Sequence, residues 1–204
     1  MLSMVRNQMA KCKEAIEKKD VSLAEEVIDD EKKINIQELA IDRDCENILA
    51  LYTPVATDLR LVLATLKITN DLERIGDSAK SLAKFLTRDL NKDEYKWLAD
   101  FNIVFMLDIL ISMLKEMGNA LRKQDTKSAI KTLKKDESLN GYNKKALKTT
   151  AELIKAHPDE AKTILTLFLL TRNLERSGDL TKNIAEEIVF HIEARVVKHK
   201  RIKK

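Results

Sequence analysis

The chain has 204 residues, of which 44% are hydrophobic, 34% are charged and only 4% are aromatic. Its four glycines and two prolines are too few for the turns of an all-β sandwich or barrel, and its hydrophobic share is too large for global disorder, so both classes are excluded. The formal charge is +4, but six basic residues lie within the last ten positions, and the chain without them carries −2. We therefore expect no nucleic-acid binding by the body of the protein and a solvated basic tail.

Neither the N-terminus nor the apolar segments predict export or a membrane span. The longest apolar stretches are 103–114, which Asp108 interrupts, and 163–171, which is shorter than the roughly 20 residues that a bilayer crossing needs. The first residues lack the charged start and apolar block of a signal peptide. Cys12 and Cys45 are too few for a disulfide scaffold, so we expect both to be reduced and mostly buried, and the protein to be cytoplasmic.

Five breaks divide the chain into helical segments. Asp20 offers an N-cap, and Asp125 stands in a similar position. Pro54 and Pro158 each look like a first helical residue, because the N–H group that proline lacks would have no hydrogen-bond partner at that position. Asn91 begins a polar break. The periodicity between these breaks predicts an all-α fold of six long helices, at residues 2–18, 21–51, 54–89, 93–123, 126–156 and 158–197.

The two halves of the chain repeat one another. DLERIGD at 71–77 corresponds to NLERSGD at 173–179, and EKKIN at 31–35 corresponds to DESLN at 136–140. These anchors and the two proline breaks keep nearly the same separation of 102 to 105 residues, which indicates a duplication. We predict two tandem three-helix bundles related by pseudo-twofold symmetry, with a first repeat at 1–90, a second at 91–197 and a basic tail at 198–204.

Acidic residues continue the apolar rows of the predicted helices in both halves. In the third helix a row that includes Leu66 becomes polar at Glu73 and Asp77, and seven residues at 100° each place Glu73 about 20° from the line through Leu66. Acids stacked beside core positions repel each other unless a cation compensates, so two helices that present them could hold a multivalent cation through oxygen ligands. Comparable positions occur at Glu31 and Asn35, at Asp136 and Asn140, and at Glu175 and Asp179.

A purely structural interpretation of these acids stays open. Glu73 and Asp77 would then pair with Arg74, with Lys80 or with basic residues of a neighbouring helix, as acids at this spacing commonly do. The same acids recur at the same place in both halves, each time with a glycine before the second acid, and this recurrence favours a metal site. Glycine inside a helix costs roughly 1 kcal/mol relative to alanine, so its presence suggests close helix packing or room for a ligand.

The motifs resemble those of the PhoU family of phosphate-transport accessory and regulatory proteins. The resemblance is carried by 54–62 with 71–77, and by 172–179 with 183–186, and it covers about residues 4–193. It implies two PhoU repeats in a cytoplasmic, non-enzymatic protein that restrains phosphate uptake and silences phosphate-starvation genes when phosphate is plentiful. The implied partners are the ATPase of the phosphate ABC transporter and the phosphate sensor histidine kinase, through which alone the protein would approach the membrane.

The resemblance also implies a metal site in each repeat. Some family members bind multinuclear iron or zinc clusters through E(D)xxxD motifs. This sequence departs from the full motif at Asn35 and Asn140, whose amide oxygens can ligate but bring no charge, and it lacks the His of the family's GDHA segment in both halves. Iron or zinc, or otherwise Mg, Mn or Ca, is the implied metal. The remaining ligands carried over by position are Glu31, Glu73, Asp77, Asp136, Glu175 and Asp179.

Two other functional classes are weighed against a regulator. A carboxylate-bundle metalloenzyme would use Glu-x-x-His motifs, which do not occur, and a nucleic-acid adaptor is disfavoured by the acidic body and few aromatics. No Ser/His/Asp or Cys/His set is apparent, and we expect His157, His191 and His199 on the surface or in the tail. Long bundle faces that expose apolar stripes also predict a homodimer.

Overall fold

The computed structural model describes residues 1–133 and 135–196, and all of their side chains except that of Asp136. This part of the chain is built from helices and short connections and contains no strand, which confirms the all-α class. The predicted tail at 198–204 lies outside the described residues. The elements are α1 (Leu2–Lys18), α2 (Val21–Tyr52), α3 (Ala56–Leu86), α4 (Lys92–Asp100), α5 (Ile103–Lys123), α6 (Thr126–Thr132), α7 (Asp136–Ala156), a 3-10 turn at Pro158–Glu160 and α8 (Ala161–Glu193).

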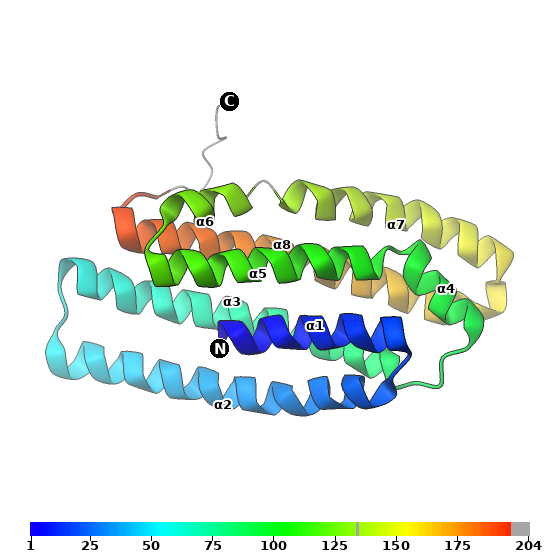
Figure 1. The fold of residues 1–204 in the computed structure, drawn as a ribbon, viewed down its shortest axis with the longest axis horizontal. Helices are drawn as coiled ribbons and strands as arrows, with labels where there is room; N and C mark the ends of the chain where they lie inside the picture. The colour runs from blue at the N-terminus through cyan, green and yellow to red at the C-terminus, as the bar shows by residue number, and fades with distance from the viewer. Residues whose placement is uncertain (134, 197–204) are drawn as a thin grey trace.

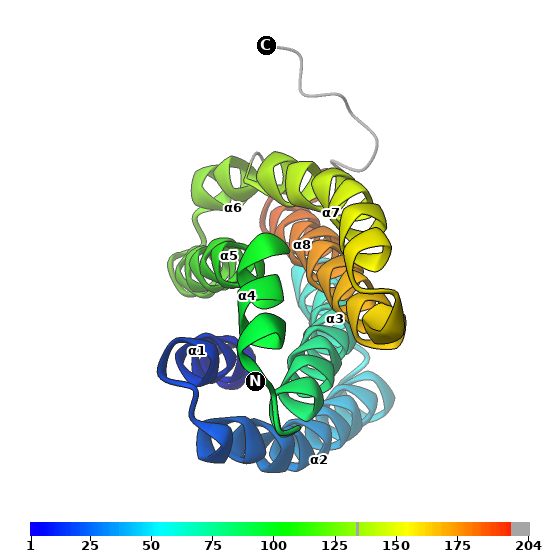
Figure 2. The same ribbon diagram turned by 90° about the vertical axis from the view of Figure 1, so that its right-hand side faces the viewer.

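The helices form an elongated bundle in which the two repeats share their inner faces (Figure 1). In the first repeat α1, α2 and α3 pack on one another, and in the second α5, α6, α7 and α8 do the same. The repeats meet where α3 lies against α8 and α1 lies against α5. Figure 2 shows that α2 and α7 are therefore the outer layers, on opposite sides of the bundle.

Two of the predicted helices are each broken into two. The predicted helix 93–123 ends at Asp100 and restarts at Ile103 with a 53° bend, because Asn102 takes a left-handed conformation with φ 58°. Asparagine tolerates this conformation better than most residues, so the break needs no glycine. The predicted helix 126–156 is likewise divided into α6 and α7. Neither break carries the Gly or Pro signal on which a sequence-based boundary depends.

The outer boundaries of two predicted helices also move. The third helix begins at Ala56, not at Pro54, because Thr53 and Ala56 both have positive φ and hold the preceding turn open. The last helix ends at Glu193, where Ala194 is left-handed, so the predicted end at 197 is too long. Pro158 does open a helical turn as predicted. The predicted cap is also present, since Asp20 accepts a hydrogen bond from the Ser22 amide.

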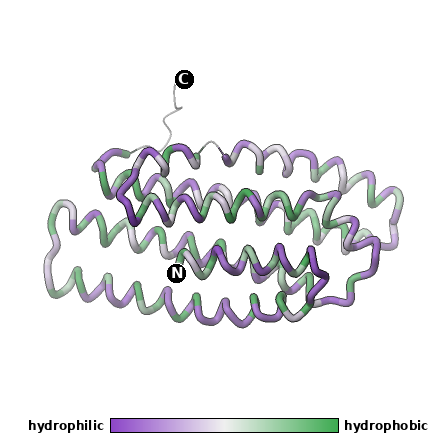
Figure 3. Tube along the Cα trace, viewed as in Figure 1, coloured by the Kyte–Doolittle hydropathy of each residue, from purple (hydrophilic) through white to green (hydrophobic). Residues whose placement is uncertain are grey.

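One continuous apolar core runs through both repeats. It includes Ile75 and Leu82 of α3, Met106 and Leu110 of α5, and Ile184 of α8, all fully buried. Hydrophobic and hydrophilic residues alternate along every helix in Figure 3, as amphipathic helices packed on one core require. Both cysteines are free thiols and buried, which confirms the expectation made for them.

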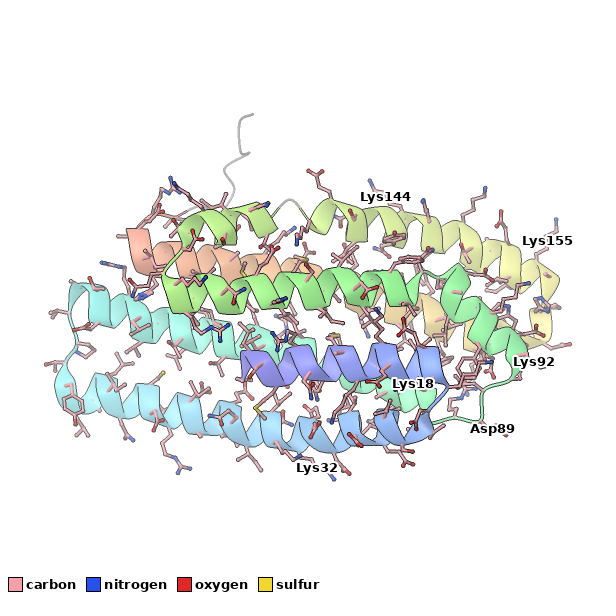
Figure 4. The ribbon with its side chains drawn as sticks, in the orientation of Figure 1. Lys18, Lys32, Asp89, Lys92, Lys144 and Lys155 are labelled. Atoms are coloured by element: carbon pink, nitrogen blue, oxygen red, sulfur yellow. The ribbon has the colours of Figure 1, made fainter. Side chains whose placement is uncertain are left out.

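Long charged side chains cover the outer faces of the bundle. In Figure 4, Lys32 of α2 and Lys144 and Lys155 of α7 project away from the helices that carry them. Within the described residues, no single helix is both long and apolar enough to cross a membrane. The bent pair of α4 and α5 is long and apolar enough only when the two helices are taken together. Both helices supply buried core side chains, including Trp97, Met113 and Leu114.

Candidate metal centre

Three acids of the first repeat converge between α2 and α3. Glu31 lies on α2, while Glu73 and Asp77 lie one turn apart on the facing surface of α3. One carboxylate oxygen from each lies within 4.8 Å of the others. Glu31 is only 1% exposed, Glu73 is half-buried, and the side chain of Asp77 is 55% exposed. The acids thus form a cluster that runs from the interior at Glu31 to the surface at Asp77.

Lys80 supplies a positive charge to this acidic cluster. Its Nζ lies 2.8 Å from Oε2 of Glu31 and 3.9 Å from Oδ1 of Asp77. The hydrogen bond with Glu31 raises the pKa of Lys80, so the ammonium stays charged. Arg74, the other basic residue considered from the sequence, lies beside Asp71 instead, at 4.0 Å. The structural interpretation is therefore correct for Lys80, which neutralises one of the three negative charges.

Two buried oxygens beside Lys80 have no hydrogen-bond donor among the described residues. Asn35 donates through Nδ2 to Oε2 of Glu31 at 3.3 Å, but its own Oδ1 is buried and accepts nothing. Oε1 of Glu31 is buried and equally without a partner. A buried acceptor left unmatched costs about 1–3 kcal/mol, so both oxygens would gain from a cation or donor at this place.

The electrostatics of the cluster favour an added cation. Burial, together with the charges of Asp77, Glu38 and Glu31, raises the pKa of Glu73. Burial, together with the charges of Asp42, Asp77 and Glu31, raises the pKa of Glu38. Glu73 and Glu38 are thus harder to ionise, partly through the repulsion expected when too few positive charges are present.

The cluster fits an oxygen-coordinated cation. Two oxygens bound to one ion at 2.0–2.6 Å can be at most about 5 Å apart, and the three carboxylates meet this limit. Glu31, Glu73 and Asp77 could supply the charged ligands, and the unmatched Oδ1 of Asn35 could supply a neutral one. Hard divalent ions and iron accept such donors, whereas a mononuclear zinc site would more often include His or Cys.

A glycine lets three helices approach one another next to the acids. A Cβ added to Gly76 would lie 3.2 Å from Oε1 of Gln8 on α1 and 3.6 Å from Ile34 on α2. Gln8 is fully buried, and its Nε2 donates to the carbonyl of Val27. The glycine before the second acid therefore serves close helix packing in this repeat.

The second repeat is described only in part. Glu175 and Asp179 lie on α8, and Asp179 forms an ion pair with Lys182 at 2.7 Å. Asn140 lies half-buried on α7, whereas the side chain of Asp136 lies outside the described residues. Among the described side chains, the group of acids spaced for a metal is the one in the first repeat, so a second site stays a prediction.

Sequence reasoning missed the part that Glu38 plays near the site and could not say which acid Lys80 contacts. Glu38 belongs to the same row of α2 as Glu31, seven residues on, and its charge acts on Glu73. That row was visible in the sequence, but the resemblance to known motifs ended at Asn35. Lys80 was one of several candidates for an ion pair, and only the relative rotation of α2 and α3 shows that it reaches Glu31.

His157 and His191 are not part of this cluster. His157 is exposed, as expected, and its ring lies 5.4 Å from that of Trp97. The expectation for His191 is wrong, because it is half-buried and its buried Nδ1 has no hydrogen-bond partner within the described part of the chain. His199 lies outside the described residues.

Comparison with known proteins agrees with this doubled architecture. The PhoU domain family model matches the chain twice, over residues 1–86 and 103–188. A phosphate-specific transport system accessory protein PhoU homolog of Aquifex aeolicus is 33% identical over 203 residues, which covers 100% of this chain and 91% of the relative. The accessory protein PhoU of Escherichia coli K12 is 27% identical over 199 residues, which covers 98% of this chain and 82% of that protein.

Solved structures of PhoU proteins also resemble this chain over nearly its whole length. The crystal structure of PhoU from Pseudomonas aeruginosa has a TM-score of 0.85 at 28% identity, covering 96% of this chain and 93% of that one. The phosphate transport system regulatory protein PhoU from Streptococcus pneumoniae has a TM-score of 0.77 at 27% identity, covering 97% and 92%. Two family matches and whole-length structural similarity lead to one conclusion: the chain belongs to the PhoU family.

Proposed function

We propose that this protein is a non-enzymatic accessory protein that regulates phosphate uptake through the phosphate-specific transport system. The observation that supports this most strongly is the double PhoU match, combined with a relative of that name whose length is almost fully covered.

Its partners in this proposal are the ATPase of the phosphate ABC transporter and the phosphate sensor histidine kinase, met in the cytoplasm. The protein would restrain uptake and keep phosphate-starvation genes silent when phosphate is plentiful. The names of the relatives support an association with the transport system as a whole.

A bound cation is the second part of the proposal. Glu31, Glu73 and Asp77, with Asn35, would hold it, and its charge would offset the burial and the neighbouring negative charges that raise the pKa of Glu73. Because these ligands come from two helices, the cation would fix α2 against α3 and so set the shape of the outer layer. Lys80 would have to withdraw from Glu31 to admit it.

Regulation is tested in the host bacterium by deleting the gene and measuring phosphate-responsive transcripts in rich phosphate. We expect these transcripts to stay high in the deletion strain and to fall when the wild-type gene is restored. An epitope-tagged copy should also retain the transporter ATPase or the sensor kinase on affinity purification. Normal repression in the deletion strain together with no retained partner would overturn the proposal.

The non-enzymatic part needs its own assay. The purified protein, loaded with Fe²⁺, Zn²⁺ or Mn²⁺, should show neither phosphatase turnover nor oxygen consumption above a Glu73→Gln variant. Turnover that disappears in that variant would instead establish a carboxylate-bundle metalloenzyme.

A further inference from the structure

A cavity lies where α1 stops short of its neighbours. α1 has 17 residues and α2 has 32, so their lengths are about 26 and 48 Å. The N-terminus of α1 therefore lies partway along the bundle, while α2 and α3 continue to the loop that joins them (Figure 1). The space beyond the first turn of α1 is bounded by α2, α3, the last turns of α5 and the end of α8, and it forms a cavity of about 610 Å³. We call it the α1-end cavity.

The charged residues around the α1-end cavity are all basic. Arg6, Lys115 and Arg122 line it, together with the imidazole of His191, and none of its lining residues in the described structure is Asp or Glu. Arg122 donates to Asn119 at 2.8 Å, but no ion pair is formed by Arg6, Lys115 or Arg122 within the described part of the chain.

Other basic residues of α1, the helix that carries Arg6, do form ion pairs. Lys11 pairs with Glu26 and Asp30 at 2.8 and 2.6 Å, and Lys13 pairs with Asp108 at 2.7 Å. Among the described residues, Arg6, Lys115 and Arg122 therefore lack the acidic partners that Lys11 and Lys13 of α1 have. Like charges gathered around a partly enclosed space repel one another, and a bound anion would relieve that repulsion.

Most of the remaining wall of the α1-end cavity is aliphatic, although Ser3, Thr65, Thr69 and Gln124 also line it. Leu61, Ile68 and Leu72 of α3 line it together with Leu2 of α1 and Ile188 of α8. Apart from the imidazole of His191, its lining within the described residues has no aromatic ring. A nucleobase usually stacks on aromatic side chains, so this wall suits an alkyl chain better than a nucleotide.

We propose that the α1-end cavity binds a small amphipathic anion, with a carboxylate or phosphate head on an aliphatic chain. The head would lie among Arg6, Lys115 and Arg122, and the chain would lie along the α3 wall. His191 contributes a buried Nδ1 that has no hydrogen-bond partner among the described residues. The volume falls within the usual range of about 300–1,000 Å³ for small-molecule pockets.

Isothermal titration calorimetry on the full-length protein tests this, with dodecanoate and dodecyl phosphate below their critical micelle concentrations. We expect one molecule to bind per chain, and the binding to be tighter for dodecanoate than for octanoate, by up to about fourfold per methylene. Dodecanol and AMP should bind at least about tenfold more weakly than dodecanoate, because one lacks the charge and the other lacks the alkyl chain. A preference for dodecanoate or for dodecyl phosphate distinguishes a carboxylate from a phosphate head.

Paired variants locate the binding. Arg6→Gln combined with Arg122→Gln should weaken dodecanoate binding by about tenfold or more. The control, Lys144→Gln with Lys155→Gln, removes the same charge from the exposed face of α7 and should leave the affinity unchanged. Leu61→Ser, at a position already 44% exposed, should weaken binding without unfolding the protein.

No detectable binding of either anion, equal binding of dodecanol or AMP, or equal losses in the cavity and control variants would overturn the proposal. These measurements use the isolated protein, so their failure would leave the proposed role in phosphate transport untouched.

Discussion

Nζ of Lys80 on α3 lies 2.8 Å from Oε2 of Glu31 on α2, and the carboxylate it meets is almost completely buried. This ion pair allows α2 and α3 to pack closely even though they bring three acids together. It also means that a cation entering the cluster would compete with the protein's own ammonium group. The affinity of the cluster for a cation thus depends on how strongly the ion binds the acids compared with the ammonium group of Lys80.

Replacing Lys80 should affect stability and metal binding in opposite directions. Lys80→Met would leave Glu31 buried without its charge partner, and we expect a loss of about 2–3 kcal/mol in the free energy of unfolding of the metal-free protein. Added Mn²⁺ should recover more stability in this variant than in the wild type. Urea unfolding with and without the ion measures both effects.

Lys84→Met is the control for Lys80→Met, because Lys84 lies one turn further along α3, is exposed, and forms no ion pair within the described residues. It should change stability by no more than about 0.5 kcal/mol. Equal effects of the two variants would show that the ion pair with Glu31 contributes nothing.

Two glycine-to-alanine substitutions should have opposite signs. A methyl group at Gly76 would lie 3.2 Å from the buried amide of Gln8, which its hydrogen bond to Val27 holds in place, so we expect Gly76→Ala to cost about 1–2 kcal/mol. Gly141 on α7 has open space around it, so Gly141→Ala should add about 0.5–1 kcal/mol through helix propensity and the unfolded state. Thermal unfolding of both variants checks the prediction, and stabilisation by Gly76→Ala would contradict the packing role.

Both thiols should be unreactive in the native protein. Burial raises the pKa of Cys12 to about 12, and its Sγ lies 3.4 Å from the carbonyl oxygen of Ala79. Burial and the charges of Asp42 and Asp44 raise the pKa of Cys45. At pH 8 we expect Ellman's reagent to label neither thiol in the folded protein and both in urea. Fast labelling of Cys12 in the native state would contradict the burial of α1.

Glu116 should contribute to stability only above acidic pH. Burial acts to raise the pKa of Glu116, but hydrogen bonds from Lys135 and Thr132 outweigh it and lower the pKa overall. A group whose pKa is lowered by folding stabilises the protein above its ordinary value of 4.5 and loses this effect as the pH falls through the folded value. Glu116→Gln should therefore be about 1 kcal/mol less stable than the wild type at pH 7, with a gap that narrows below about pH 4. A gap of constant size from pH 7 to pH 3 would contradict this.

Much of the fold could be predicted because helix patterning is local. The apolar period predicted α1 and α2, matching segments at a constant separation predicted the repeat, and the cap at Asp20 marked a boundary correctly. The breaks at Asn102 and between α6 and α7 could not be predicted, because no Gly or Pro marks them and the bend depends on how α4 and α5 pack in the whole bundle. Packing between distant helices overrides local preference at such places.

The sequence was enough to predict which acids come together in the candidate site, but not how deeply each of them is buried. One row of α3 and one row of α2 correctly brought Glu31, Glu73 and Asp77 together. The rotation of each helix about its axis decides how far each acid is buried, and it places Glu31 inside and Asp77 at the surface. The same rotation selects Lys80 over Arg74 as the partner. The second metal site and the homodimer stay predictions.

The most direct test of a cation site in the first repeat is elemental analysis of the purified protein after equilibration with iron, zinc or manganese and gel filtration. The wild type should retain metal in a fixed ratio to protein. A Glu31→Gln, Glu73→Gln, Asp77→Asn variant, which keeps the shape but removes three charges, should lose the part held by the first repeat. Equal metal content in the two proteins, or none in the wild type, would contradict the account.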